Sequence, residues 1–290
     1  MERKPVSPVD DAQAPMPAGP LHWLRCGALE VALAPEAGGR IAQLRYQGVD
    51  WLVGPEDGWP ATIAWGCYPM VPWAGRIRRG RFDFGGRSFV LPINFEAHAI
   101  HGVGFSRPWR IDPLEADVAT LSLALPEDEY WPFGGIATQV IELMPDSVRL
   151  QLEVRAGAHA MPAVLGWHPW FRKPERMEFA PDAMYPRDEE GIAVYPTVVP
   201  TPGSWDDCFI SRRDVVLERD GQRLRLRSDS NHWVVYDGAA HATCVEPQTG
   251  PPDGFTLMPN RLEPGQCLYL TFEMTFAPCV ASTQADPAQP

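Results

Sequence analysis

Val148-Arg149-Leu150-Gln151-Leu152-Glu153-Val154 alternates aliphatic and polar side chains without a break. Successive side chains of a β-strand point to opposite faces of the sheet, so this run predicts a strand with one buried and one solvated face. The same period of two returns where Leu224 and Leu226 stand among arginines, and again from Leu268 to Phe276. These three runs predict strands that each cover part of a hydrophobic core.

Shorter runs with strand character extend from these three in both directions. They lie at residues 29–33, 40–46, 51–53, 82–84, 88–91, 121–125, 138–143, 215–218, 233–236 and 241–246. The 32 prolines and 25 glycines interrupt the chain every few residues and leave little room for long helices. Many short strands joined by turn residues, with no helical repeats between them, predict an all-β protein with a large antiparallel β-sandwich.

The ends of the chain differ in composition from its middle. No composition break divides residues 21–276, which we expect to form one domain, whereas the Pro-rich and Ala-rich segments 1–20 and 277–290 predict disordered tails. No apolar run approaches the roughly 18 residues that cross a bilayer, and the start lacks the apolar stretch of a secretory signal. The six cysteines are scattered without a CxxC pair, so we expect a cytoplasmic protein with reduced thiols.

The net charge of −12 excludes some classes of partner. Neutralising phosphates needs clustered Lys and Arg, and an acidic surface disfavours both nucleic acid and an anionic membrane. The one dense basic cluster, Arg76-Ile77-Arg78-Arg79-Gly80-Arg81, lies in a Gly-rich and aromatic segment and is compatible with a solvated turn or a phosphate site. We expect a small-molecule ligand and a monomer or weak dimer.

Two residues stand out as an acid and a base. His168 lies in Gly166-Trp167-His168-Pro169-Trp170-Phe171, where burial lowers and a carboxylate raises the pKa of a histidine. Glu246 lies in Val245-Glu246-Pro247-Gln248, at the expected end of a strand where Pro247 stops regular pairing. The alternatives are a buried histidine that binds backbone and a surface glutamate in a salt bridge.

Further polar and aromatic residues could line a site around this pair. His101 stands in a Gly-rich turn, Arg76 follows a rigid aromatic loop, and Asp206 precedes a strand; Gln248 and Trp170 flank the acid and the base. A guanidinium, a carboxylate and a flat indole are typical partners of sugar hydroxyls and of a pyranose face. Each also has an ordinary structural role, in a turn for Asp206 and in the core for Trp170.

Metal and nucleophile chemistry are less favoured. His101, His168 and Glu246 would make a set of two histidines and one carboxylate, but the chain has no HxH or HxxxH pair. It also lacks the GxSxG motif and any local signature around a cysteine. We therefore expect no metal ion.

Six blocks, in order, resemble the aldose 1-epimerase (galactose mutarotase) family. They are Gly38-Gly39-Arg40-Ile41, the segment from Pro69 to Phe82, Ile100-His101-Gly102-Val103-Gly104-Phe105, Gly166 to Phe171, Asp206-Asp207-Cys208-Phe209 and Val245 to Gln248. The resemblance spans nearly the whole structured chain. Gly75 stands where many relatives have Asn, and Trp170 and Arg172 stand where they often have Tyr and Asn.

The resemblance implies a galactose-mutarotase-like supersandwich that interconverts α and β anomers of a hexose without any cofactor. It implies that His168 is the general acid, Glu246 the general base and His101 a second histidine on the ring-oxygen side, while Arg76 and Asp206 bind hydroxyls. Glu246 is then expected ionised and His168 protonated, facing each other across a sugar ring. The alternatives are a sugar-binding protein without catalysis on this fold and, because of Arg78, Arg79 and Arg172, a hexose-6-phosphate mutarotase.

Overall fold

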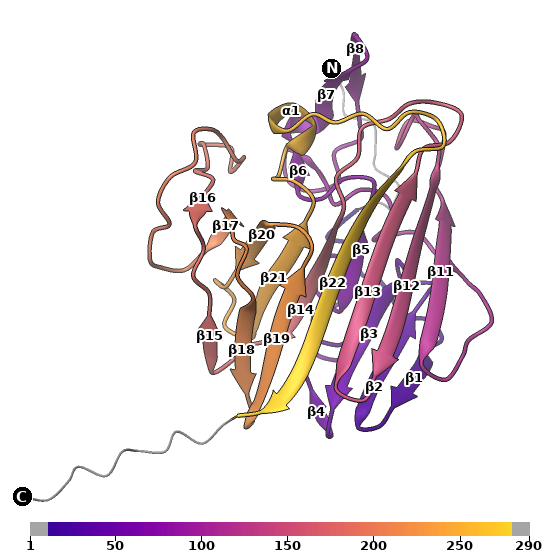
Figure 1. The fold of residues 1–290 in the computed structure, drawn as a ribbon. Helices are drawn as coiled ribbons and strands as arrows, with labels where there is room; N and C mark the ends of the chain where they lie inside the picture. The colour runs from indigo at the N-terminus through magenta and orange to yellow at the C-terminus, as the bar shows by residue number, and fades with distance from the viewer. Residues whose placement is uncertain (1–10, 280–290) are drawn as a thin grey trace, which may run out of the picture.

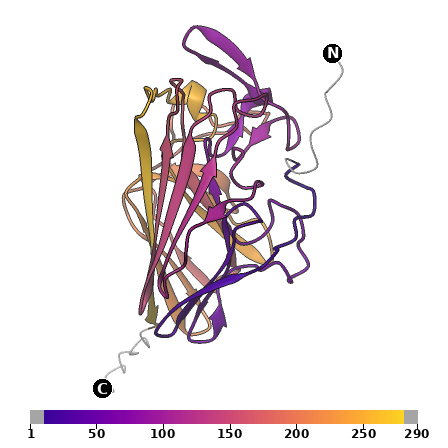
Figure 2. The same cartoon turned by 90° about the vertical axis from the view of Figure 1, so that its right-hand side faces the viewer.

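The computed structural model describes residues 11–279, and their strands form two large antiparallel sheets packed face to face. In Figure 1 the eight-stranded sheet lies in front of the ten-stranded sheet, and Figure 2 shows both layers from the side. The predicted all-β antiparallel sandwich is confirmed. One short helix, α1 (Gly254–Leu257), and one 3-10 turn, η1 (Arg78–Gly80), interrupt the described strands.

The ten-stranded sheet carries both candidate residues of the acid and base pair. Its order is β1 (His22–Cys26), β2 (Leu29–Ala34), β3 (Arg40–Tyr46), β5 (Cys67–Met70), β14 (Gly166–Arg172), β21 (Ala242–Gln248), β20 (His232–Tyr236), β17 (Asp206–Ile210) and β16 (Ala183–Met184), with β4 (Val49–Asp50) beside β3. Strands β14 and β21 are therefore central neighbours.

The eight-stranded sheet contains the three runs with the clearest alternation. Its order is β10 (Arg110–Ile111), β11 (Val118–Ala124), β12 (Ile136–Met144), β13 (Ser147–Arg155), β22 (Cys267–Pro278), β19 (Gln222–Ser228), β18 (Val215–Arg219) and β15 (Arg176–Glu178). Two small pairs complete the described strands, β6 (Arg76–Ile77) with β9 (Ala99–Ile100) and β7 (Arg81–Phe84) with β8 (Arg87–Val90). The β7–β8 hairpin projects beyond the two sheets in both views.

The core lies between the two sheets. Every second side chain of β13, from Val148 to Val154, is buried there, as the alternation predicts. From the other sheet, the indoles of Trp167 and Trp233 reach Phe272 of β22, with ring centroids 6.1 and 6.2 Å from its ring. Since side chains alternate along a strand, Trp167 on the core side places its neighbour His168 on the outer face of the ten-stranded sheet.

Two local expectations within the strands are wrong. The pairing does not stop at Pro247, because Glu246 and Gln248 on either side of it still pair with Val234 and His232. Strand β21 therefore continues through the proline, which lacks only its own backbone N–H donor. The expected strand 51–53 is also displaced. Pairing with β3 occurs at β4 instead, and Leu52 makes only an isolated bridge to Phe171.

The expected disordered tails, residues 1–20 and 277–290, include residues that the structure places against the body of the protein. The side chain of Ala12 is fully buried, and the backbone N–H of Met16 donates to the carbonyl of Pro60 at 2.8 Å, so residues 11–20 are held against the body. Strand β22 continues to Pro278, which pairs with Gln222. Local apolar contacts and strand pairing outweigh the Pro-rich and Ala-rich composition there, whereas 1–10 and 280–290 lie outside the described residues.

Two further expectations concern the membrane and the cysteines. Within residues 11–279 none of the helices has the length and apolar character needed to cross a membrane. All six cysteines are free thiols, as their scattered spacing predicts.

The packing between the sheets predicts that substitutions on the two faces of β22 differ in their effect on the free energy of unfolding. Phe272→Ala removes a fully buried ring that touches the opposite sheet, and we expect it to lower the free energy of unfolding by about 3–5 kcal/mol. Tyr269→Ala, on the outer face of the same strand where the side chain is 60% exposed, should change it by less than about 0.5 kcal/mol. Urea unfolding measures both, and equal losses would contradict this packing.

Candidate functional site

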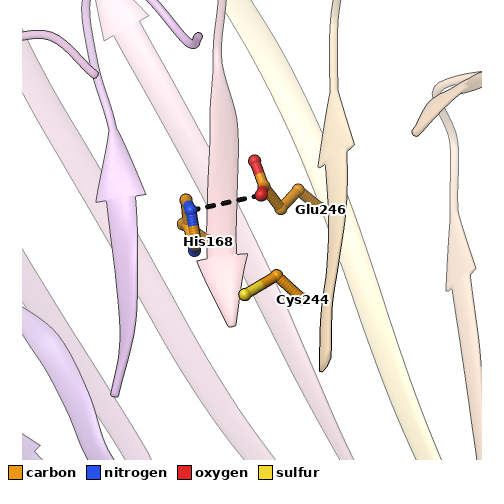
Figure 3. Close-up of side chains that lie close together, drawn as sticks. All are labelled: His168, Cys244 and Glu246. Carbon is orange, nitrogen blue, oxygen red and sulfur yellow. Dashed lines mark ion pairs between the residues drawn. The ribbon is translucent and has the colours of Figure 1, made fainter. Parts of the chain in front are cut away.

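The register of two central strands brings the predicted acid and base together. Gly166 pairs with Gln248 and Trp170 with Cys244, so His168 lies directly opposite Glu246 on the outer face of the sheet. The Nε2 atom of His168 is 3.2 Å from Oε1 of Glu246 (Figure 3). Facing side chains in neighbouring antiparallel strands are natural contact partners. The sheet therefore fixes this pair without help from a loop.

A cavity of about 290 Å³ opens over the pair. It collects all seven residues that the sequence singled out: Arg76, His101, His168, Trp170, Asp206, Glu246 and Gln248. The same wall contains residues that the sequence did not indicate: Ile63, Phe95, Val234, Tyr236 and Pro252. Convergent polar groups in a partly apolar hollow are typical of a small-molecule site.

The expectation that the acid and base face each other across a sugar ring is wrong. At 3.2 Å the two groups are in contact, because their strands are neighbours and the side chains project from the same face. His168 is 6% and Glu246 2% exposed, and both reach the cavity from its floor. A ligand must therefore lie over the pair.

Burial also sets the protonation of the pair. It lowers the pKa of His168 to about 3, with the nearby Arg40 and Arg76 adding repulsion of the cation. Burial, followed by the charge of Asp206, raises the pKa of Glu246 well above its ordinary value. Both effects favour uncharged groups, although the geometry is that of an ion pair. Burial therefore favours one proton in the pair, on the carboxyl, and the carboxylate and imidazolium expected in the complex with a sugar require transfer of that proton to His168.

Two flat rings hold the imidazole of His168 in place. The phenol ring of Tyr68 stacks on it at 4.8 Å between centroids, and the indole of Trp170 at 5.4 Å. The Trp170 Nε1–H and the Tyr68 hydroxyl donate to the same carbonyl, that of Ile63, at 2.6 and 3.1 Å. Tyr68 pairs with His168 in the register, so strand assignment of Cys67–Met70 could have found it.

His101 lies edge-on to the same imidazole. Its ring centroid is 5.0 Å from that of His168 at an interplanar angle of 83°, and burial lowers its pKa well below the ordinary value. Its backbone has φ of +61°, and its N–H donates to the carbonyl of Gly75 at 3.0 Å. The buried Nδ1 atom has no hydrogen-bond partner within residues 11–279. A neutral imidazole with an unused nitrogen is suited to hydrogen bonding with a ligand.

The two charged residues of the cavity wall, Asp206 and Arg76, differ in whether an ion pair neutralises their charge. Asp206 makes an ion pair with Arg187, Oδ2 to Nη1 at 2.7 Å, so part of its charge is neutralised. Arg76 has no carboxylate within ion-pair distance in the described part of the chain, and its guanidinium lies 5.6 Å from the ring of Phe95. Arg187 comes from a long loop before β17, and no sequence pattern indicates that it meets Asp206.

Gln248 supports the carboxyl from the side. Its Nε2 atom donates to Oε2 of Glu246 at 3.1 Å, and its buried Oε1 atom has no partner among residues 11–279.

Gly75 has a backbone φ of +68°, and a Cβ atom there would lie 2.9 Å from Pro252. A side chain at position 75 would therefore strain the backbone and meet Pro252, which explains the glycine.

A buried cation lies beneath the site. Arg40 is fully buried, and its guanidinium donates to the carbonyls of Ala37, Thr62, Trp65 and Phe105. It also lies 5.0 Å from the ring of Tyr68, the residue that stacks on His168. Burial lowers its pKa to about 9. The sequence showed Arg40 only as part of a glycine block, and nothing in that block indicates these contacts.

The three arginines that suggested a hexose 6-phosphate form ion pairs outside the cavity. Arg78 pairs with Asp188 and Arg79 with Glu190, both at 2.5 Å, and Arg172 pairs with Asp57 at 2.6 Å. None of the three lines the cavity.

The three potential metal ligands that the structure brings together differ from the set of His101, His168 and Glu246 considered from the sequence. Residues His168, Cys244 and Glu246 are buried and bring one ligand atom each within 4.8 Å of the others. Cys244 precedes Glu246 by two residues on β21 and therefore projects from the same face.

One family model matches most of the chain. The family model described as Aldose 1-epimerase matches residues 24–272. The uncharacterized protein YihR of Escherichia coli (strain K12) is 27% identical over 249 residues, which cover 75% of this chain and 80% of YihR.

Solved structures share the fold. A galactose mutarotase-like protein from Clostridium acetobutylicum has a TM-score of 0.79 at 16% identity, over 88% of this chain and 94% of that chain. Galactose 1-epimerase from Lactobacillus acidophilus NCFM has a TM-score of 0.75 at 18% identity, over 89% and 95%. These values show a common architecture.

The raised pKa of Glu246 predicts that Glu246→Gln increases the free energy of unfolding, by an amount that depends on pH. A raised folded-state pKa gives stability that is complete below the unfolded value of 4.5 and is lost as pH rises through the folded value. The amide copies the protonated carboxyl and does not ionise. Above about pH 6.5 His168 is neutral in the folded and the unfolded state. There the free energy of unfolding of the variant, relative to wild type, should rise by up to about 1.4 kcal/mol per pH unit. Urea unfolding at several pH values measures this, and a constant difference would contradict it.

Proposed function

The chain belongs to the aldose 1-epimerase family, and on that premise we propose that it interconverts the α and β anomers of an aldose. The observation that carries the proposal is the 3.2 Å contact between His168 and Glu246 at the floor of a cavity. At about 290 Å³ the cavity is close to the lower limit of about 300 Å³ for ligand pockets, which favours one monosaccharide over a longer chain.

The close contact of the pair suits the chemistry of an anomeric centre. The two oxygens that exchange protons, the anomeric hydroxyl and the ring oxygen, are both bonded to C1 of the sugar. An acid and a base that touch each other can therefore serve both oxygens when the sugar lies over them. Groups on opposite sides of the ring are not needed.

Ring opening needs a redistribution of the one proton in the pair. When the sugar binds, the carboxyl proton of Glu246 passes to His168 and gives a carboxylate and an imidazolium. Glu246 then takes the proton of the anomeric hydroxyl while His168 protonates the ring oxygen, the C1–O5 bond breaks and the C1 aldehyde forms. Rotation about C1–C2 and reclosure return both protons, so the pair ends as it began.

The remaining wall residues are assigned to binding. His101, which lines the cavity edge-on to His168, is assigned to hydrogen bonding on the ring-oxygen side. Arg76, Asp206 and Gln248 would hold hydroxyls, because each presents donors or acceptors at the cavity wall. The indole of Trp170 fixes the acid by stacking and offers apolar surface to the sugar.

Two alternatives are less well supported. A sugar-binding protein without catalysis would not need a buried acid in contact with a buried base, since burying both groups costs stability. A hexose 6-phosphate as substrate was suggested by Arg78, Arg79 and Arg172, whose charges are used in ion pairs outside the cavity.

Substitution of either member of the pair should abolish most of the activity. We expect Glu246→Gln and His168→Asn each to lower kcat for mutarotation at least about a hundredfold, the usual contribution of a positioned acid or base. Polarimetry of freshly dissolved α-D-glucose and α-D-galactose measures the rate. Glu263→Gln and His159→Asn make the same chemical changes at exposed side chains outside the cavity and should retain wild-type rates.

Calorimetry with the same sugars separates catalysis from binding. Variants of the pair that are as fast as wild type would contradict the roles given to His168 and Glu246. Sugar binding by the wild-type protein without any acceleration of mutarotation would instead support the sugar-binding alternative.

A further inference from the structure

Cys244 is a buried nucleophile beside the pair for which ring opening has no use. It is fully buried, it lies two residues before Glu246 on β21, and it is not part of the cavity wall. Its Sγ atom, an imidazole nitrogen of His168 and a carboxylate oxygen of Glu246 all lie within 4.8 Å of one another. Figure 3 shows the three side chains on the same side of the two strands.

We propose that His168, Cys244 and Glu246 form an inhibitory site for a thiophilic divalent cation such as Zn²⁺ or Cd²⁺. The donor set of one thiolate, one imidazole and one carboxylate is the chemistry that these ions take. Two ligands at i and i+2 on one strand, with a third across from them on the next strand, converge on a common point above the sheet. The fourth tetrahedral position is left for water from the cavity.

Small side-chain movements would complete the coordination. Bonds of about 2.0–2.3 Å in a tetrahedral zinc site keep ligand atoms about 3.3–3.8 Å apart, somewhat closer than the 4.8 Å limit within which these atoms lie. The Nε2 atom of His168 already lies 3.2 Å from Oε1 of Glu246, and its lone pair can bind the ion once the proton shared with the carboxyl has left.

The charge balance favours an ion at this depth. Binding displaces the thiol proton of Cys244 and the one proton held by His168 and Glu246, so two protons leave and a dication meets one thiolate and one carboxylate. The complex is neutral, as burial requires.

Occupation of this site would stop catalysis. The ion coordinates both His168 and Glu246, so neither residue can exchange a proton with a sugar. This consequence rests on the proposed function, whereas the binding of the ion does not.

Cd²⁺ titration tests the binding directly, because a cadmium–thiolate bond gives a charge-transfer absorption in the ultraviolet. Cys26, Cys267 and Cys279 are partly exposed, so the titration uses a background in which all three are Ser. We expect one equivalent of Cd²⁺ with a thiolate band in this background. Cys208→Ala removes another buried thiol of the same sheet. This variant should keep the thiolate band and the affinity for Cd²⁺.

Cys244→Ala should remove the band and weaken binding at least about tenfold, the least loss expected when a metal site loses a partner. Glu246→Gln keeps every thiol and should weaken binding by a similar factor, which covers the case that Cys244→Ala does not fold. A missing band in the parent, or Cd²⁺ affinity that Cys244→Ala and Glu246→Gln leave unchanged, would overturn the proposal.

Inhibition is measured separately. Zn²⁺ should stop mutarotation by the wild-type protein, a chelator should restore it, and Cys244→Ala should resist the same Zn²⁺ concentration. Mutarotation that Zn²⁺ leaves unchanged, at concentrations where the thiolate site is filled, would contradict inhibition. A protein that binds Cd²⁺ as expected but never accelerates mutarotation would contradict the proposed function and leave the metal site standing.

Discussion

The pairing of β14 with β21 is the constraint on which the site depends. It places His168 opposite Glu246, and the alternation of side chains sends both to the outer face while Trp167 enters the core. A shift of one residue in this register would turn one member of the pair toward the core. The large buried side chains between the sheets hold the register, so the packing of the sandwich and the chemistry of the outer face are set by the same strands.

Burial gives the pair its chemical character. The same loss of solvent lowers the pKa of His168 and raises that of Glu246, so two groups that could form an ion pair rest as a neutral pair with one mobile proton. Tyr68 and Trp170 fix the imidazole between their rings, and the buried cation of Arg40 adds to the cost of charging it. Such a pair can give and take a proton without a change in net charge, which is what the proposed ring opening needs.

The sequence predicted the fold better than the arrangement of the site. Alternation identified β13 and β22 because one face of each is solvated, whereas β14 and β21 are buried almost throughout and contain prolines, so their faces could not be told apart. The seven residues named from the sequence all line the cavity, but their contacts depend on the register between distant segments. The neutral state of His168 and Glu246 follows from burial, which local sequence does not reveal.

The most direct measurement is a crystal structure with a bound aldose. The account predicts that the anomeric hydroxyl lies within hydrogen-bond distance of the Glu246 carboxyl, and that the ring oxygen lies within the same distance of the His168 imidazole, with the sugar above the pair. A sugar bound in the cavity with its C1 turned away from both residues would contradict it.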